Sequence, residues 1–249
     1  MKLSLALGQF RGKLADLRQR VKGELDRLGK EIELWRHGWR LKRHVIVESL
    51  EYQHYLETQL RRSLSRKRAG LETRSRVLID KTADLIDLSH CEVLCVGCRN
   101  RAEVEYFRDK GASSVVGIDL HSESTDILVM DMHQMIFPDE HFDVVYCSHS
   151  LEHAYDVGKV VSEIVRVARS GAAVAIEVPV KYETRGADLV DFGSVQNLQA
   201  AFAPHIAEVL LSAEQPSHSH PNQEGTAVVR TVFSIFKSSD KADESAADG

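Results

Sequence analysis

Apolar and polar residues follow two different periods along the chain. In residues 1 to about 68, apolar side chains return on average every 3.6 residues, as on one face of an α-helix: Leu3, Leu7, Phe10, Leu14, Leu17, Val21, Leu25, Leu28, Ile32, Trp35 and Trp39. This period predicts a straight amphipathic helical region, not a long supercoil, although a short coiled coil over residues 3–21 stays open. Five glycines in the first 38 residues weaken the prediction, since each costs about 1 kcal/mol relative to alanine.

After Gly70, short apolar runs alternate with helical patterns, which is typical of an α/β domain. We expect a helix over residues 71–88, a buried strand over 93–96, a helix over 102–110 that Gly111 ends, and a strand over 115–119. Residues 126–131 and 142–147 predict two more strands, and the second of them is followed by an exit loop, 148–153.

The remaining pattern predicts one more parallel strand and an antiparallel pair. We expect a helix over 156–169 capped by Gly171, a strand over 172–178 stopped by Pro179, a charged loop over 180–192, a helix over 195–202 that Ser194 caps, and closing strands over 206–211 and 227–236. The sequence therefore predicts three parts: a basic helical extension (1–70), an α/β domain (71–237) and a tail (238–249) that is disordered by composition.

The first strand–helix–strand unit has features of a nucleoside site. Gly97, in the turn after the first strand, lets a ligand approach the backbone beside a helix N-terminus. Asp119 ends the second strand about 20 residues later, where a carboxylate can accept hydrogen bonds from both ribose hydroxyls. A plain α/β domain without a ligand is the alternative on these residues alone.

Charge is distributed unevenly. Residues 1–80 carry a net charge of +9, and the remainder carries −14. Nine basic residues of the first part could meet nucleic acid or an anionic membrane, but a solvated face is the simpler interpretation: Arg36, Arg40, Lys42, Arg43, Arg61, Arg62, Arg66, Lys67 and Arg68. Aromatic residues are not interleaved with them, so nucleic acid is not the expected partner. The apolar face needs a partner, which can be a second copy, the α/β domain or another protein.

Cysteine usage and hydropathy predict a soluble cytoplasmic protein. Four cysteines in 249 residues are no disulfide framework, and no apolar run is long enough to span a membrane. Cys95 and Cys98 form a C-x-x-C pair, but Cys95 falls inside the buried strand, so we predict no metal site. His218 and His220 are expected to be exposed polar residues.

Four segments in the same order resemble the class I S-adenosylmethionine-dependent methyltransferases: VLCVGCRN, VVGIDL, VMDMHQMIFPDEHFDVVYCSHSLEH and SEIVRVARSGAAVAIEV. The resemblance covers about residues 92–237. It implies a Rossmann-like, doubly wound, seven-stranded, mostly parallel sheet whose last strand is antiparallel. It also implies S-adenosyl-L-methionine as the cofactor.

By position in that family, nine residues would bind the cofactor. Gly97, Cys98 and Arg99 match the turn that carries its methionine portion, and Asp119 with Leu120 matches the ribose site. Asp131 with Met132 matches the adenine contact, and Ser148 lies near the expected methyl group. Glu103, at the start of the following helix, completes the nine. The family turn D-x-G-x-G-x-G is altered here to Cys95, Gly97, Arg99 and Arg101. We therefore hypothesise that Glu103 meets the cofactor ammonium and that Arg99 or Arg101 meets its carboxylate.

A second departure is the link after Asp119, residues 120–126, which is too short for the helix of a parallel crossover. The adenine side should then be open or filled by the N-terminal region.

Methyl transfer mainly requires positioning of the acceptor, and an oxygen or nitrogen acceptor can also need a base. His149 and His153 are the candidate bases, although loop hydrogen bonds would explain them equally well. Tyr182, Arg185 and Asp188 are positional candidates for acceptor contacts. The sequence lacks an N-P-P-Y type motif, which favours a small molecule, a sugar or a lipid-linked glycan as acceptor. The rival hypothesis is an inactive methyltransferase-fold scaffold that acts through its basic helices.

Overall fold

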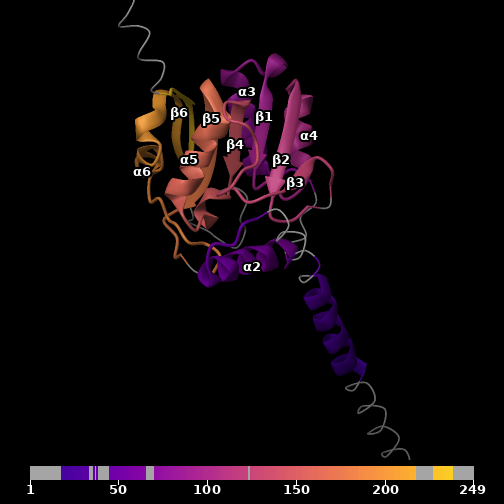
Figure 1. Ribbon diagram of the computed structural model, residues 1–249. Helices are drawn as coiled ribbons and strands as arrows, with labels where there is room; N and C mark the ends of the chain where they lie inside the picture. The colour runs from indigo at the N-terminus through magenta and orange to yellow at the C-terminus, as the bar shows by residue number, and fades with distance from the viewer. Residues whose placement is uncertain are drawn as a thin grey trace, which may run out of the picture. The chain divides into compact units, whose positions relative to one another are not determined.

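The computed structural model describes residues 18–33, 36, 38, 45–65, 70–122, 124–184, 186–216 and 227–237. Its centre is a seven-stranded sheet with the order β3-β2-β1-β4-β5-β7-β6 (Figure 1). The strands are β1 (Glu92–Val96), β2 (Ser114–Asp119), β3 (Ile127–Val129), β4 (Phe142–Ser148), β5 (Ala168–Val180), β6 (Ile206–Pro216) and β7 (Ala227–Ile235). Strands β1 to β5 pair in parallel, and β7 is antiparallel to both of its neighbours. The predicted Rossmann-like, doubly wound sheet is confirmed.

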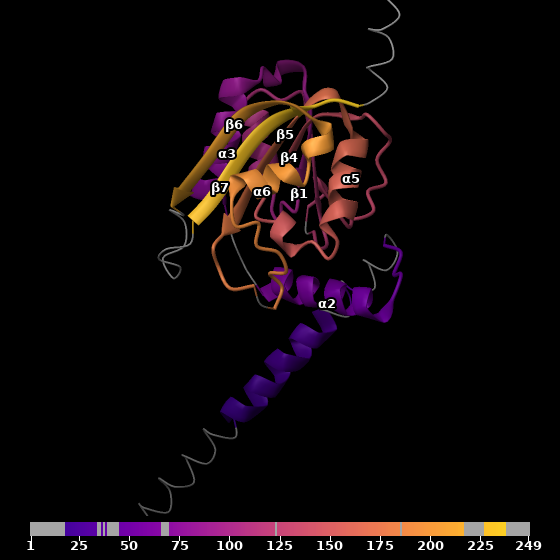
Figure 2. The same ribbon diagram turned by 90° about the vertical axis from the view of Figure 1, so that its left-hand side faces the viewer.

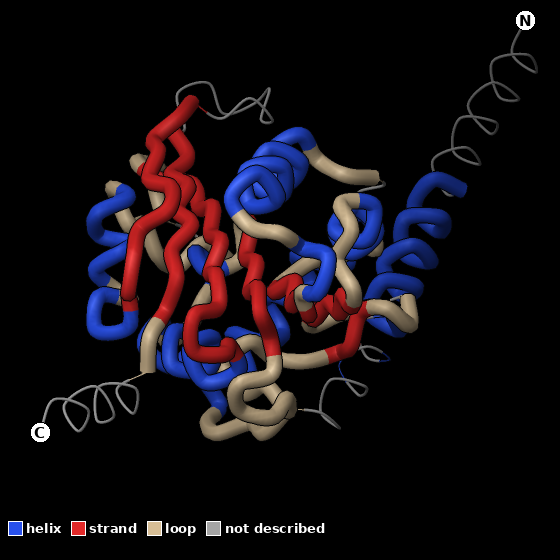
Figure 3. The backbone as a smooth tube through the Cα atoms, turned by 90° about the horizontal axis from the view of Figure 1, so that it is seen from above, coloured by secondary structure: helices blue, strands red, loops and turns tan. Residues whose placement is uncertain are grey.

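Helices cover both faces of the sheet, as Figures 2 and 3 show. Helices α3 (Thr73–Leu85) and α4 (Ala102–Asp109) pack on one face, and α5 (Val157–Val167) and α6 (Val195–Ala200) pack on the other. Helix α5 begins where its sequence predicts, because the Asp156 side chain accepts a hydrogen bond from the Lys159 amide at 3.0 Å. Helix α6 begins in the same way at Ser194, which accepts from the Asn197 amide.

The chain leaves the centre of the sheet in opposite directions after β1 and after β4. Strand β1 leads outward to β2 and β3, whereas β4 leads to β5, β7 and β6. The carboxyl ends of β1 and β4 therefore flank the switch point at which α/β sheets bind ligands.

Several predicted boundaries are wrong. The predicted helix over 71–88 ends at Leu85, and residues Leu88–His90 form a separate 3₁₀ turn. Gly171 does not cap α5, since that helix ends at Val167 and β5 already begins at Ala168. Gly171, with φ +80°, lies in a bulge where β5 shifts its register against β4.

Pro179 does not end the fifth strand as predicted, because β5 continues to Val180. The pairing of β4 with β5 ends at Glu177, so Pro179 has a strand partner only in β7. A residue without an N–H is tolerated where one side of the strand is unpaired. The closing strand β6 is also longer than predicted and extends to Pro216.

The N-terminal region is helical over residues 18–33 and again in α2 (Leu50–Ser65), but residues 45–49 between them are not helical. The chain forms two compact units, Met1–Arg40 and Leu41–Gly249, so α2 belongs with the sheet although we predicted a boundary near residue 70. Several expectations lie outside the described residues, namely those for residues 3–17, Trp35, Trp39 to Arg43, Arg66 to Arg68, Arg185, His218, His220 and the tail 238–249.

No helix among the described residues combines the length and apolar character needed to cross a bilayer.

Helix α2 packs beside the short link between β2 and β3. Tyr52, Tyr55 and Leu56 form an apolar cluster with Leu120 and Val129. The described residues of the link form no helix, and the N-terminal region fills the space, which is one of the two outcomes that the short link predicts.

Tyr52 ties α2 to the sheet by a 2.5 Å hydrogen bond from its hydroxyl to Asp131 Oδ2, and both residues are buried. We expect Tyr52→Phe to lower the free energy of unfolding by about 1.5–3 kcal/mol, since a buried carboxylate loses a donor. Urea denaturation measures the change. Tyr155→Phe is the control, because Tyr155 packs against Tyr52 but is 49% exposed. An equal loss in both variants would contradict the prediction.

Candidate functional site

A cavity that is open to solvent lies at the carboxyl ends of the strands that flank the switch point. Eight of the eleven residues proposed from the sequence line it: Gly97, Arg99, Asp119, Leu120, Asp131, Met132, His149 and His153. A second open cavity shares Gly97, Arg99 and His149 with the first and is also lined by the other three, Cys98, Glu103 and Ser148. The fold therefore gathers all eleven residues around two adjoining cavities.

Gly97 adopts φ +72° and donates its amide to the Ile118 carbonyl at 2.8 Å. A Cβ atom at this position would lie 2.0 Å from Ser150 Oγ. The close approach that glycine permits is therefore used by Ser150 of the same chain, whose hydroxyl donates to the Gly97 carbonyl at 3.3 Å.

Cys98 turns its side chain into the core, so only its backbone can face a ligand. Its Sγ atom lies against Gly117, where a Cβ would be only 2.2 Å away. Cys95 is buried in the same apolar cluster, and burial raises the pKa of both thiols well above its usual value. No cluster of three or more His, Cys, Asp or Glu side chains in the described part of the chain is arranged to hold a metal ion.

Asp119 joins the turn after β1 to the end of β2. Its Oδ2 accepts from the Arg99 amide and its Oδ1 from the His121 amide, both at 3.1 Å. Ser63 of α2 lies 3.4 Å from Oδ1. Burial raises the pKa of Asp119, and the Arg99 guanidinium opposes that rise. The carboxylate is thus held in place while it lines the cavity.

Asp131 lines the same cavity, but the protein already engages its carboxylate. Oδ1 accepts from the His133 amide at 2.9 Å and lies 2.7 Å from His133 Nδ1, and Oδ2 accepts from Tyr52. Burial raises the pKa of Asp131, but the hydrogen bonds from His133 and Tyr52 outweigh burial, so the net shift is downward. An adenine contact at this position therefore rests more on Met132 than the sequence suggests.

Glu103 lies in the first turn of α4, where its carboxylate accepts from Ser75 Oγ at 2.5 Å and faces the Tyr146 hydroxyl at 3.4 Å. Burial raises its pKa to about 7, against the lowering effect of the Ser75 hydrogen bond and the Arg74 charge. A nearby cation would favour its ionised form.

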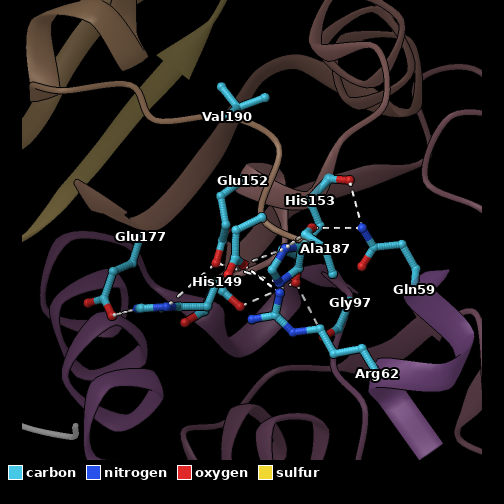
Figure 4. Close-up of polar contacts among 12 residues, drawn as sticks. Gln59, Arg62, Gly97, His149, Glu152, His153, Glu177, Ala187 and Val190 are labelled. Carbon is cyan, nitrogen blue, oxygen red and sulfur yellow. Dashed lines mark hydrogen bonds and ion pairs between the residues drawn. The ribbon is translucent and has the colours of Figure 1, made fainter. Parts of the chain in front are cut away.

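His149 is held from both sides. Its Nε2 lies 3.0 Å from Glu177 Oε1 (Figure 4). Its Nδ1 lies 3.3 Å from Arg74 NH1. Because a guanidinium can only donate, Nδ1 accepts, and the protonated Nε2 donates a hydrogen bond to Glu177. The backbone adopts φ +52°, which is uncommon for a residue other than glycine. With both nitrogens engaged, His149 is better suited to fix the loop than to accept a proton.

His153 is held from one side only. Its Nδ1 lies 3.0 Å from the Ala187 carbonyl and 3.2 Å from Asp188 Oδ1. Its Nε2 lies 3.8 Å from Glu152 Oε1, which is beyond hydrogen-bond distance. A carbonyl can only accept, so Nδ1 carries the proton and a neutral ring presents Nε2 as an acceptor.

Sequence reasoning missed the contribution of α2 to the cavity, namely Tyr55, Gln59, Arg62 and Ser63. The short link after Asp119 was the only signal, since it predicted that another segment could fill this side. The sequence places Arg62 among the basic residues of a solvated face, whereas in the structure it pairs with Asp188 at 2.6 Å.

Comparisons with known proteins agree with this architecture. Residues 94–176 match the family model of the methyltransferase domain. No curated protein sequence is significantly similar to the chain.

Among solved structures, the 1,6-didemethyltoxoflavin-N1-methyltransferase of Burkholderia thailandensis, with bound 1,6-didemethyltoxoflavin and S-adenosylhomocysteine, has a TM-score of 0.53 and 16% identity. The match covers 67% of this chain and 80% of that one. The YcgJ protein of Bacillus subtilis has a TM-score of 0.53 at 12% identity, with coverage of 65% and 99%. The [4+2]-cyclase SpnF has a TM-score of 0.52 at 15% identity, with coverage of 66% and 81%. At these identities the likeness shows the fold, and the fold alone does not fix the reaction.

Proposed function

We propose that the chain is a class I S-adenosylmethionine-dependent methyltransferase that transfers a methyl group to a small molecule, a sugar or a lipid-linked glycan. The match of residues 94–176 to the methyltransferase domain model and the fold shared with solved methyltransferases support the proposal. The observation that carries the proposal is the cavity at the switch point, where the Gly97 turn, the Asp119 carboxylate and His153 meet. When bound, S-adenosylmethionine supplies a methyl group activated by a sulfonium.

The residues present fit that cofactor. In our proposal Asp119 accepts hydrogen bonds from the ribose hydroxyls, and Leu120 and Met132 line the nucleoside side. In the second cavity Glu103 pairs with the cofactor ammonium, and Arg99 pairs with its carboxylate. The pKa of Glu103, about 7 without a ligand, would fall in the presence of a bound cation.

His153 is the proposed base on the acceptor side. Its Nε2 removes the proton of an acceptor hydroxyl or N–H group as that group attacks the methyl carbon. His149 is proposed to hold the loop after β4 between Arg74 and Glu177.

The segments that are joined beside His153 restrict the space there, which favours a small acceptor. Helix α2 and the loop 181–193 are joined beside it by the hydrogen bond from Gln59 Nε2 to the Ala187 carbonyl at 2.8 Å. The Burkholderia methyltransferase of similar fold was solved with bound 1,6-didemethyltoxoflavin, which supports a small-molecule acceptor. All four cysteines are free, and three of them are buried, which supports a reducing compartment such as the cytoplasm.

Calorimetric titration with S-adenosylmethionine and S-adenosylhomocysteine tests the proposal. We expect micromolar binding of both, followed by methylation when a panel of hydroxyl- and amine-bearing metabolites is added with labelled cofactor. A folded protein that binds neither ligand would refute the proposal and favour the inactive scaffold, which the altered Arg99 and Arg101 turn would then explain.

Asp119→Ala should weaken cofactor binding at least about tenfold, or ~1.4 kcal/mol. The variant loses the ribose acceptor and also the link between the turn and the end of β2. Titration measures the affinity, with Asp126→Ala as the control, because Asp126 pairs with Arg101 and Arg108 and lines neither cavity. Unchanged affinity in Asp119→Ala would refute the ribose assignment.

A further inference from the structure

We propose that Asp188 is a positioning residue for His153, that Arg62 of α2 holds Asp188 in place, and that the acceptor therefore reacts through a hydroxyl or N–H group. This inference rests on the proposed methyl transfer, but its structural part can be tested without an acceptor.

Two groups of the loop 181–193 fix the His153 ring. The Ala187 carbonyl and the Asp188 carboxylate both lie within 3.2 Å of Nδ1. Both are acceptors, so each favours the tautomer with the proton on Nδ1. A solvent-exposed imidazole favours the opposite tautomer, and the loop therefore selects the form whose Nε2 can accept a proton.

Asp188 is itself held as an anion. Burial opposes ionisation, but the hydrogen bonds from His153 and Arg62 outweigh it and lower the pKa of Asp188 to about 2. The Arg62 guanidinium reaches Asp188 Oδ1 at 2.6 Å, and neither side chain is more than one-quarter exposed. The contacts from Arg62 to Asp188 and from Asp188 to His153 thus connect helix α2 to the cavity.

The backbone of the loop is also attached to α2 and to the turn after β4. Gln59 Nε2 donates to the Ala187 carbonyl, and the Glu152 carbonyl accepts from the amides of Leu189 and Val190. Figure 4 shows Gln59 and Arg62 approaching the loop from α2. These contacts hold Ala187 and Asp188 at a fixed distance from the imidazole.

The other charged groups near His153 do not take the place of Asp188. Glu152 Oε1 lies 3.8 Å from Nε2 and 3.7 Å from His149 Nδ1, so it faces both rings without a hydrogen bond to either. An anion there stabilises the imidazolium that forms after proton transfer. His149 already has a partner on each ring nitrogen.

The proposed step transfers a methyl group to the acceptor and a proton to His153. The acceptor oxygen or nitrogen forms a bond to the methyl carbon while the carbon–sulfur bond breaks and its electron pair stays on sulfur. The proton from the acceptor passes to His153 Nε2, and the imidazolium lies between Asp188 and Glu152. An acceptor that is already a free nucleophile, such as a thiolate, would not need this arrangement.

Nuclear magnetic resonance of the full chain with ¹⁵N-labelled histidine tests the positioning role. Signals of His153 are assigned by their loss in His153→Gln, and the tautomer is read from the two ring nitrogens at a pH where the ring is neutral. We expect the Nδ1–H form in the wild type. In Asp188→Asn the ratio of Nδ1–H to Nε2–H should fall about fivefold to tenfold, because the neutral amide oxygen of asparagine is a weaker acceptor than the carboxylate.

Arg62→Met should change the ratio in the same direction, and Asp191→Asn is the control. Asp191 lies in the same loop, where it accepts from the Lys181 and Gly193 amides. A predominantly Nε2–H form in the wild type, or equal ratios in wild type and Asp188→Asn, would overturn the positioning role. An unchanged ratio in Arg62→Met would overturn the part assigned to α2.

The activity assay separates this inference from the proposed function. With the acceptor found in the panel, Asp188→Asn should lower kcat at least about tenfold, with no change in cofactor affinity. Cofactor binding with an unaltered kcat would refute the inference and leave the methyltransferase assignment intact. Failure of the wild type to bind cofactor would refute the assignment, whatever tautomer His153 shows.

Discussion

Replacing Arg230 by methionine should lower the free energy of unfolding by about 3–5 kcal/mol at pH 8, since a buried carboxylate would lose its cation. Arg230 and Glu177 are directly opposite each other on β7 and β5, and their side chains are 4% and 0% exposed. The guanidinium donates to Glu177 through Nε and to Gln215 through NH1. Methionine has a similar length, so the change removes the charge and the donors with little loss of volume.

The loss should depend on pH. Burial raises the pKa of Glu177 to about 7, above its usual 4.5, against the opposing charge of Arg230. A carboxyl whose pKa is raised by folding contributes stability below about pH 4.5 and loses it as the pH rises through the folded value. Without Arg230 the folded pKa rises further, so the variant should be closest to the wild type near pH 5 and furthest from it at pH 8.

Urea denaturation at pH 5 and pH 8 measures both effects. Arg169→Met is the matched control, because Arg169 also bridges two carboxylates, Glu92 and Asp143, but all three side chains are about one-third exposed. Its loss should be at most about 1 kcal/mol and nearly independent of pH. Equal losses in Arg230→Met and Arg169→Met would contradict the account given for Glu177.

The sequence predicts the centre of this fold well because its signals are local there. Apolar runs of a few residues identify β1, β2 and β4, and a glycine at positive φ ends α4 at Gly111 as expected. The same reasoning fails at Gly171, because a glycine in a bulge and a glycine after a helix look alike in sequence. The pairing with β4 ends before Pro179, so this part of β5 pairs only with β7 and tolerates the proline; this too is a property of the sheet and not of the segment.

The same distinction between local and long-range signals applies to the residues of the site. Residues at the ends of strands reach the cavity because topology brings the carboxyl ends of parallel strands together, so Asp119 and His153 could be placed by their position. The contacts of Tyr52 with Asp131 and of Arg62 with Asp188 join residues 79 and 126 positions apart. No periodic pattern encodes such a contact, and it follows only from the way α2 packs on the assembled sheet.

Gly97→Ala should lower the free energy of unfolding by about 2–5 kcal/mol and weaken cofactor binding more than any other single change in the turn. Two costs add. An alanine at φ +72° adopts the left-handed region at about 1–2 kcal/mol. Its methyl group would also lie 2.0 Å from Ser150 Oγ and 2.5 Å from Ser150 Cβ, so the turn or the loop after β4 must move, at about 1–3 kcal/mol.

Two further variants separate these costs. Gly111→Ala has the conformational cost alone, because Gly111 adopts φ +99° with nothing within 4 Å of the added Cβ. Ser150→Gly removes the colliding atoms, so the double variant Gly97→Ala/Ser150→Gly should recover the packing cost and keep the conformational one. Urea denaturation and cofactor titration of the four variants give the comparison. If Gly97→Ala costs no more than Gly111→Ala, or if Ser150→Gly gives no recovery, the turn is not held by Ser150. The Gly97 backbone would then be free to approach a ligand, as the sequence alone suggests.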